Sequence, residues 1–196
     1  MANELQLLRA DAIELLESAD VNNLGEASKA GNKKLAFIGA QLYLVDPDGA
    51  AAMAGLNAPV AAGATKALTV AEHNGKTIKL DTAAGSVVTL PAATGSGAKF
   101  RFAITVIATS NSHIVKVANA TDTMYGLVSV LSDDSAAVLG YKASGTDDTI
   151  TLNRTTTGST ALGEWLELED IASGKWAVRG MLAATGTEAT PFSATV

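Results

Sequence analysis

The chain has few of the residue types on which most catalytic and metal sites depend. It contains no cysteine and only two histidines in 196 residues. Without cysteine there is no disulfide, no thiolate zinc site, no iron–sulfur ligation and no thiol nucleophile. His73 and His113 each stand alone near a predicted turn, whereas a metal site usually needs two or three ligands and a catalytic triad needs a base beside its nucleophile. We therefore predict no catalytic, cofactor-binding or metal-binding residue, and a protein that is not an enzyme.

Basic and aromatic residues are also scarce. The 14 basic residues are outnumbered by 20 acidic ones, the formal net charge is −6, and basic residues gather nowhere beyond the pair Lys33 and Lys34. Because binding to a phosphate backbone normally needs a basic stripe, we do not expect nucleic acid as a partner. Only 5% of the residues are aromatic although 47% are hydrophobic, so small Ala and Val side chains and Leu make up much of the core. The sequence thus predicts a thin core that contacts with other subunits complete.

No hydrophobic run near the N-terminus is long enough to span a membrane, and no basic segment precedes one, so we expect neither a signal peptide nor a membrane partner. Instead, apolar residues recur at helical spacing over residues 4–19, with acidic residues on the other face. This pattern predicts an amphipathic helix of about four turns. Its apolar stripe is formed by Leu5, Leu8, Leu15 and Leu16, which we predict to dock against a partner protein. The alternative is that the stripe packs back onto the rest of the chain.

The next part of the sequence predicts a boundary between two regions. Residues 35–45 form an apolar run that indicates one strand or a bent pair of strands, and a Pro-containing turn follows at residues 46–49. Residues 50–66 contain eight alanines and are interrupted by glycine and proline. We therefore divide the chain into an N-terminal helix and docking arm (1–49), an Ala/Gly-rich linker (50–67) and a β-domain (68–196).

The β-domain is indicated by a change of composition. Twenty of the 21 threonines follow Lys66, and short apolar or alternating runs recur between clusters of Gly, Ser, Asn and Asp. Strands at this spacing are typical of an antiparallel β-sandwich or barrel, jelly-roll-like, and not of a βαβ arrangement. The predicted strands are residues 77–80, 87–90, 99–107, 113–117, 124–131, 136–141, 149–152, 165–168 and 176–182.

Several polar clusters in the β-domain admit a functional and a structural interpretation. Asp133 with Asp134, Asp147 with Asp148, and the acidic residues of 167–170 offer oxygen ligands for calcium, but none follows the spacing of a calcium-binding loop. We favour the structural interpretation, in which these acids bind backbone groups of turns. The glycine-rich residues 95–97 lack the lysine and the following helix of a phosphate-binding loop, so we expect no phosphate site there.

The two tryptophans, Trp165 and Trp176, also leave two interpretations open. Exposed aromatic rings stack on sugars in many binding modules, and a pair of them would form a glycan platform. With only two tryptophans in the chain, anchoring of the core is the favoured alternative.

Several phrases of the β-domain resemble a known family. These are residues 74–81 (NGKTIKLD), 85–100 (GSVVTLPAATGSGAKF), 110–120 (SNSHIVKVANA), 148–153 (DTITLN), 165–171 (WLELEDI) and 176–180 (WAVRG). They are similar to the head decoration proteins, also called cement or head-fibre proteins, of tailed bacteriophages. The resemblance covers residues 69–196, about two thirds of the chain, and does not include the N-terminal segment.

The resemblance implies a non-enzymatic virion protein on the outer surface of a capsid. Such proteins are typically homotrimers that clamp neighbouring subunits of the major capsid protein, which would then be the partner of this chain. In that case Leu5, Leu8, Leu15 and Leu16 are the residues that we expect to dock on the capsid. The alternative is a head- or tail-fibre adhesin whose β-domain binds a host-surface receptor or glycan, with Trp165 and Trp176 as its contact residues.

Overall fold

The computed structural model describes residues 34–38, 41–45, 51–53 and 58–196. The chain divides into two units, Met1–Leu56 and Asn57–Val196. Among the described residues, no helix is long and apolar enough to cross a membrane. The predicted helix over residues 4–19, and with it the four leucines of the stripe, lies outside the described residues.

The first unit contains a small antiparallel sheet. Strand β1 (Lys34–Ile38) pairs with β2 (Gln41–Val45), and β2 pairs with β3 (Ala51–Met53). The apolar run at residues 35–45 is therefore a pair of strands, the second of the two forms that its sequence allowed. The third strand lies in the interval that was predicted to be a linker.

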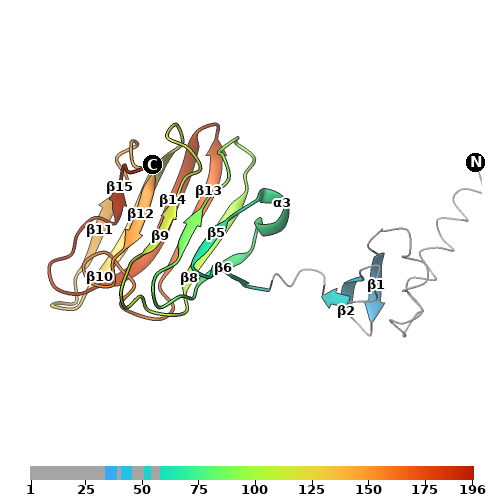
Figure 1. Cartoon of the computed structure of the whole chain (residues 1–196), viewed down its shortest axis with the longest axis horizontal. Helices are drawn as coiled ribbons and strands as arrows, with labels where there is room; N and C mark the ends of the chain where they lie inside the picture. The colour runs from blue at the N-terminus through green and yellow to red at the C-terminus, as the bar shows by residue number, and fades with distance from the viewer. Residues whose placement is uncertain (1–33, 39–40, 46–50, 54–57) are drawn as a thin grey trace, which may run out of the picture. The chain divides into compact units, whose positions relative to one another are not determined.

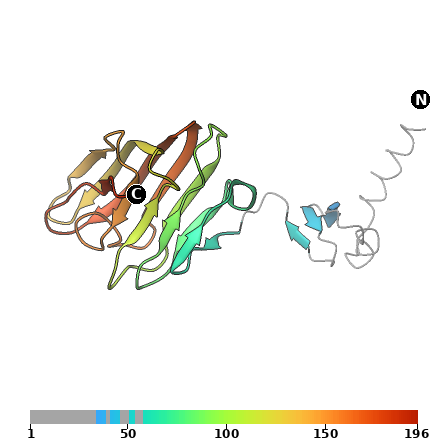
Figure 2. The ribbon, with the colours of Figure 1, turned by 45° about the horizontal axis from the view of Figure 1, so that its top comes forward.

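The second unit is mainly β and consists of two sheets (Figures 1 and 2). The seven-stranded sheet contains, in order, β11 (Val138–Lys142), β10 (Thr123–Ser132), β14 (Lys175–Ala184), β13 (Trp165–Ala172), β8 (Lys99–Ile104), β6 (Thr77–Leu80) and β4 (Val60–Ala61). The five-stranded sheet contains β15 (Phe192–Ser193), β12 (Thr149–Leu152), β9 (His113–Lys116), β7 (Val87–Thr89) and β5 (Thr65–Ala67). All nine strands predicted from the sequence are present, with ends shifted by a few residues.

The expectation of antiparallel sheets is wrong, because both sheets are mixed. From β4 to β9 consecutive strands alternate between the two sheets, so neighbours within one sheet are two strands apart in the sequence. A chain that crosses to the other sheet and returns runs in its original direction again. Accordingly β4, β6 and β8 are parallel to one another, and so are β5, β7 and β9. The ladder of β10 with β14 is also parallel.

The predicted linker requires a further correction. Its second half contributes β4 to one sheet and β5 to the other, and Ala62 between them is buried. The unit boundary therefore falls between Leu56 and Asn57 rather than at residue 68.

The core follows from the alternation of the strands. Even-numbered residues of β6, β8, β13 and β14 point inward, and the rings of Phe100 and Trp176 lie 5.8 Å apart in a tilted arrangement. Buried side chains of the five-stranded sheet, such as Val88, Val115 and Leu152, belong to the same cluster. The two sheets therefore share one hydrophobic core.

One short helix precedes β6. Helix α3 (Val70–His73) begins after Thr69, whose side-chain oxygen accepts a hydrogen bond from the Glu72 backbone N–H at 3.3 Å. This is the usual role of threonine at a helix N-cap.

Candidate functional site

The outward face of the seven-stranded sheet is the most distinctive surface of the second unit. Odd-numbered residues of β10, β13 and β14 point to this face, because the even-numbered residues of these strands enter the core. The register of the ladders places outward residues of neighbouring strands side by side, for example Leu131 between Val138 and Ala183. The face can therefore be followed strand by strand from β11 to β8.

Large apolar side chains gather where this face crosses β11, β10 and β14. Leu127 and Val138 are each 62% exposed, Met181 is 57% exposed and Leu131 is 48% exposed. Leu131 is directly opposite Val138, and Met181 is opposite Ser129, which lies between Leu127 and Leu131 on β10. We call these four residues, Leu127, Leu131, Val138 and Met181, the apolar patch. Single exposed leucines are ordinary, but adjacent ones on a rigid sheet are typical of an interaction surface.

The other half of the same face is charged. Arg179 on β14 binds two carboxylates of β13: its Nε lies 3.0 Å from Glu167 Oε1, and its Nη2 lies 2.8 Å from Glu169 Oε2. Lys99 on β8 adds a longer contact of 3.4 Å to Glu169. The acids at 167 and 169 therefore neutralise neighbouring cations, and because all these groups are solvated the pairs contribute little to stability. Arg179, Glu167 and Glu169 form a polar rim beside the apolar patch.

The structure separates the two tryptophans. Trp165 lies on the outward face, directly opposite Met181, and the guanidinium of Arg101 lies 5.2 Å from its ring centroid. Trp176 points to the other side of the sheet and is 0% exposed. The pair of glycan-contacting rings that the adhesin alternative requires is not formed, because the two residues point to opposite faces of the sheet. Trp176 is a core residue, as the favoured alternative predicted.

Both histidines form hydrogen bonds with backbone groups and have a structural role. His113 is buried, and its Nδ1 accepts the Ser86 backbone N–H at 3.0 Å while its Nε2 lies 2.9 Å from the Val106 carbonyl oxygen. This pairing requires the neutral ring with the proton on Nε2. Burial lowers the pKa of His113, although the hydrogen bond to Val106 opposes the effect. His73 Nδ1 accepts the backbone N–H of Thr69 at 3.1 Å, at the start of α3.

The backbone amides of residues 94–96, which overlap the glycine-rich residues 95–97, form a cradle that the side chain of Asp170 occupies. The carboxylate of Asp170 accepts hydrogen bonds from the backbone N–H groups of Thr94 (3.0 Å), Gly95 (2.7 Å) and Ser96 (2.9 Å). The hydroxyls of Thr94 and Ser96 donate as well, at 3.3 and 2.7 Å. Burial raises the pKa of Asp170, but these hydrogen bonds outweigh it and lower the pKa from 3.8 to about 2.

Other buried acids have the same role. Glu164 accepts the backbone N–H groups of Ser159, Thr160 and Ala161 at 2.9, 2.6 and 2.6 Å. Asp148 accepts the N–H groups of Thr195 and Val196, which attaches the C-terminal residues to β12. The structural interpretation of these acids is confirmed for Asp148 and Asp170. Within residues 58–196 and the strands of the first unit, no three acidic or histidine side chains are grouped so as to hold a metal ion.

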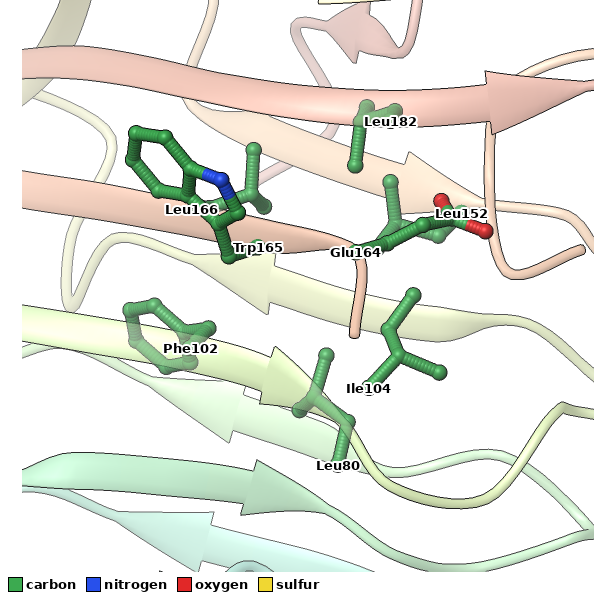
Figure 3. Close-up of a pocket in the computed structure, with 8 residues that line it drawn as sticks. All are labelled: Leu80, Phe102, Ile104, Leu152, Glu164, Trp165, Leu166 and Leu182. Atoms are coloured by element: carbon green, nitrogen blue, oxygen red, sulfur yellow. The ribbon is translucent and has the colours of Figure 1, made fainter. Parts of the chain in front are cut away.

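A narrow void lies within the core of the second unit, as Figure 3 shows. It is too narrow to admit a water molecule. It is lined by apolar side chains of both sheets, including Phe102, Leu152 and Leu182, with the Glu164 side chain at one end. Because Glu164 is already bound to three amides of its own loop, the void is a packing gap and not a ligand pocket.

Comparison with known proteins adds no assignment, since no protein-family model and no curated protein matches the chain. The apolar patch is the feature that sequence reasoning missed. The signal was present on β10, where Leu127 and Leu131 occupy the phase opposite to the buried Val128 and Val130. An apolar residue in the outward phase of an otherwise regular strand indicates a surface contact.

Proposed function

We propose that this chain is a non-enzymatic virion structural protein that decorates and stabilises the capsid of a tailed bacteriophage. It binds the lattice of the major capsid protein on the outer surface of the virion, as an oligomer whose expected form is a homotrimer. The resemblance of residues 69–196 to head decoration proteins supports the class of protein. The apolar patch supports its mode of action, which is binding to other protein surfaces.

The apolar patch is the single observation that carries this proposal. Four large apolar side chains remain about half exposed or more on a sheet whose ladders fix their positions. Exposed apolar side chains lower the solubility of an isolated domain. They are useful only when another protein covers them. The polar rim at Arg179, Glu167 and Glu169 then supplies orientation rather than affinity.

The proposal assigns separate roles to the two regions of the chain. The amphipathic segment with Leu5, Leu8, Leu15 and Leu16 docks on the capsid as a helix in a groove, the role that its periodicity predicts. The second unit contacts neighbouring proteins of the lattice through the apolar patch. Two contacts on one chain raise the overall affinity, because the second contact forms within an already bound molecule.

We also propose that the two mixed sheets form a β-sandwich. Support comes from their shared core, in which Leu152 of the five-stranded sheet lines the same void as Phe102 and Leu182 of the seven-stranded sheet. Neighbouring inward faces of two sheets interdigitate in this way in sandwiches.

The adhesin alternative has less support. It now depends on Trp165 alone, because Trp176 is buried. The Arg101 guanidinium already lies over the Trp165 ring, where a sugar would stack.

The proposal is tested by co-sedimentation with undecorated heads of the phage that encodes the chain. The apolar-patch variant combines Leu127→Asp with Met181→Asp, and the arm variant combines Leu8→Asp with Leu15→Asp. The matched control is Ile171→Asp, because Ile171 is 50% exposed but lies beside the bulge at the other end of β13. We expect wild type and control to sediment with the heads and both double variants to remain in the supernatant.

Retained binding by both double variants would refute the proposed contacts. If the wild type ignores heads but adsorbs to host cells, and Trp165→Ala abolishes that adsorption, the adhesin function replaces the decoration function.

A further inference from the structure

The edge strand β11 differs from the other edges of the two sheets in the second unit. The edge strands β4 and β15 have two residues each and β5 has three, whereas β11 has five. Short edge strands are a common protection against unwanted pairing, and β11 does not have this protection. It also carries apolar side chains on both faces, with Val138 62% and Leu139 38% exposed.

The hydrogen-bonding phase of β11 shows which backbone groups face the open edge. The Ser132 N–H donates to the Ala137 carbonyl, and the Ala143 N–H donates to the Gly126 carbonyl, at the two ends of the ladder with β10. Hydrogen-bonded pairs alternate with non-bonded pairs in an antiparallel ladder. Residues 139 and 141 therefore bond to β10, while the backbone groups of Val138, Gly140 and Lys142 point away from it.

We propose that β11 pairs with β11 of a second copy of this chain, antiparallel and about a two-fold axis at Gly140. In this register Val138 lies opposite the partner's Lys142, and Leu139 lies opposite the partner's Tyr141. Each of the three outward-directed residues then donates one backbone hydrogen bond to the second copy and accepts one from it. The seven-stranded sheets of two copies become one continuous sheet, a form of strand addition.

The side chains of β11 complement themselves in this register. Leu139 and the partner's Tyr141 form an aliphatic–aromatic cross-strand pair, which occurs twice because of the symmetry. On the other face Val138 packs on the aliphatic stem of the partner's Lys142. The strand also has charges of opposite sign at its ends, since Asp133 and Asp134 lie in the hairpin before it and Lys142 ends it.

The charge distribution favours a second copy in antiparallel orientation over a parallel one. Antiparallel pairing directs the basic end of each β11 toward the acidic end of the other, whereas parallel pairing would bring like charges together. The inference goes beyond the proposed function and does not depend on a capsid. It would bring the apolar patches of two copies onto one face of one sheet.

Thiol cross-linking tests the register directly, and the chain has no cysteine of its own to confuse it. The variant is Gly140→Cys, because a Cβ added at Gly140 meets no atom within 4 Å. Facing residues of a bonded antiparallel pair have Cα atoms about 5.5 Å apart, within the range of about 4.4–6.8 Å that a disulfide bridges. The control is Ile171→Cys, at an exposed site on β13 outside the edge.

We expect mild oxidation, or a short thiol-specific bifunctional reagent, to convert most of the full-length Gly140→Cys chain to a covalent dimer. The Ile171→Cys chain should give less than about a tenth as much, since its thiols do not meet at a two-fold axis. A Gly140→Cys chain that cross-links no better than the control overturns the proposal, whichever protein occupies the edge instead.

A charge-swap series provides a second test by analytical ultracentrifugation of the full chain. Val138→Lys places a lysine opposite the partner's Lys142 and should shift the association to at least tenfold higher concentration. Adding Lys142→Glu to this variant restores opposite charges and should restore association. Met181→Lys, at a similarly exposed site two strands from the edge, should associate as the wild type does.

Equal association of the wild type and Val138→Lys contradicts the proposed pairing, as does a double variant that is weaker than Val138→Lys. Both tests omit phage heads, so their failure leaves the head-binding experiment unaffected. Conversely, Met181→Lys lies in the apolar patch and is expected to impair head binding while it preserves the β11 contact.

Discussion

Replacing Asp170 should destabilise the second unit more than replacing any exposed acid. The carboxylate is 1% exposed and accepts five hydrogen bonds from residues 94–96. The lowering of its pKa from 3.8 to about 2 corresponds to a stabilisation of about 2 kcal/mol at neutral pH. Asp170→Asn removes this contribution and turns an amide NH₂ group toward backbone donors. We therefore expect it to lower the free energy of unfolding by about 2–3 kcal/mol.

The pH dependence provides an independent readout of the same contact. The pKa of Asp170 is lower in the folded chain, so the unfolded chain binds its proton first as the pH falls. The stabilisation is complete above the unfolded pKa and is lost as the pH falls toward about 2. Asp170→Asn should therefore flatten the acid limb of the stability curve below about pH 4.

Urea unfolding followed by tryptophan fluorescence measures both effects, because Trp165 and Trp176 belong to the same unit. Asp134→Asn, on the exposed hairpin between β10 and β11, is the matched control and should change the free energy by less than about 0.5 kcal/mol. If Asp170→Asn matches this control, and its acid limb equals that of the wild type, the amide cradle does not contribute to stability as argued.

Two further predictions concern the buried His113 and the close backbone contact at Gly126. Because burial lowers the pKa of His113, the unfolded chain binds a proton at this residue first, so stability should decrease as the pH falls below about 6.5. His113→Gln should remove this pH dependence in urea titrations at pH 5.5 and 7.5. An unchanged pH dependence would assign it to another group. Gly126→Ala would bring a Cβ to 1.9 Å from the Val178 carbonyl oxygen, at a φ of +135°. It should cost more than about 3 kcal/mol in the same assay, whereas Gly140→Ala, in open space, should cost less than about 1 kcal/mol; equal losses would contradict the close approach of β10 and β14.

The sequence was sufficient to find nine strands of the second unit, but not β4, β5 and β15, nor the way in which the strands pair. Alternation of apolar residues has a period of two in parallel and antiparallel strands alike, so it located β6 and β12 without revealing their neighbours. The mixed sheets arise because the chain crosses between the sheets from β4 to β9. That choice depends on contacts between distant segments, as in the parallel ladder of β10 with β14.

Residue types predicted the structural role of the acids, but not the surface that carries the proposed function. Asp170 follows the alternating buried and partly exposed residues 165–169. A turn-binding role for an acid at this point was the favoured interpretation. Its partners at residues 94–96 were too far away in the sequence to identify. The apolar patch required the register, because Leu131, Val138 and Met181 become neighbours only when three strands are aligned.

The most direct test of the central claim is the stoichiometry of binding to undecorated heads. The full-length chain is titrated against heads of known copy number, and bound protein is quantified after sedimentation. We expect saturation at a fixed small-number ratio to the major capsid protein, and decorated heads that withstand higher temperature than bare heads. A chain that remains in the supernatant at every concentration, or binds without saturation and without stabilising the heads, contradicts the claim.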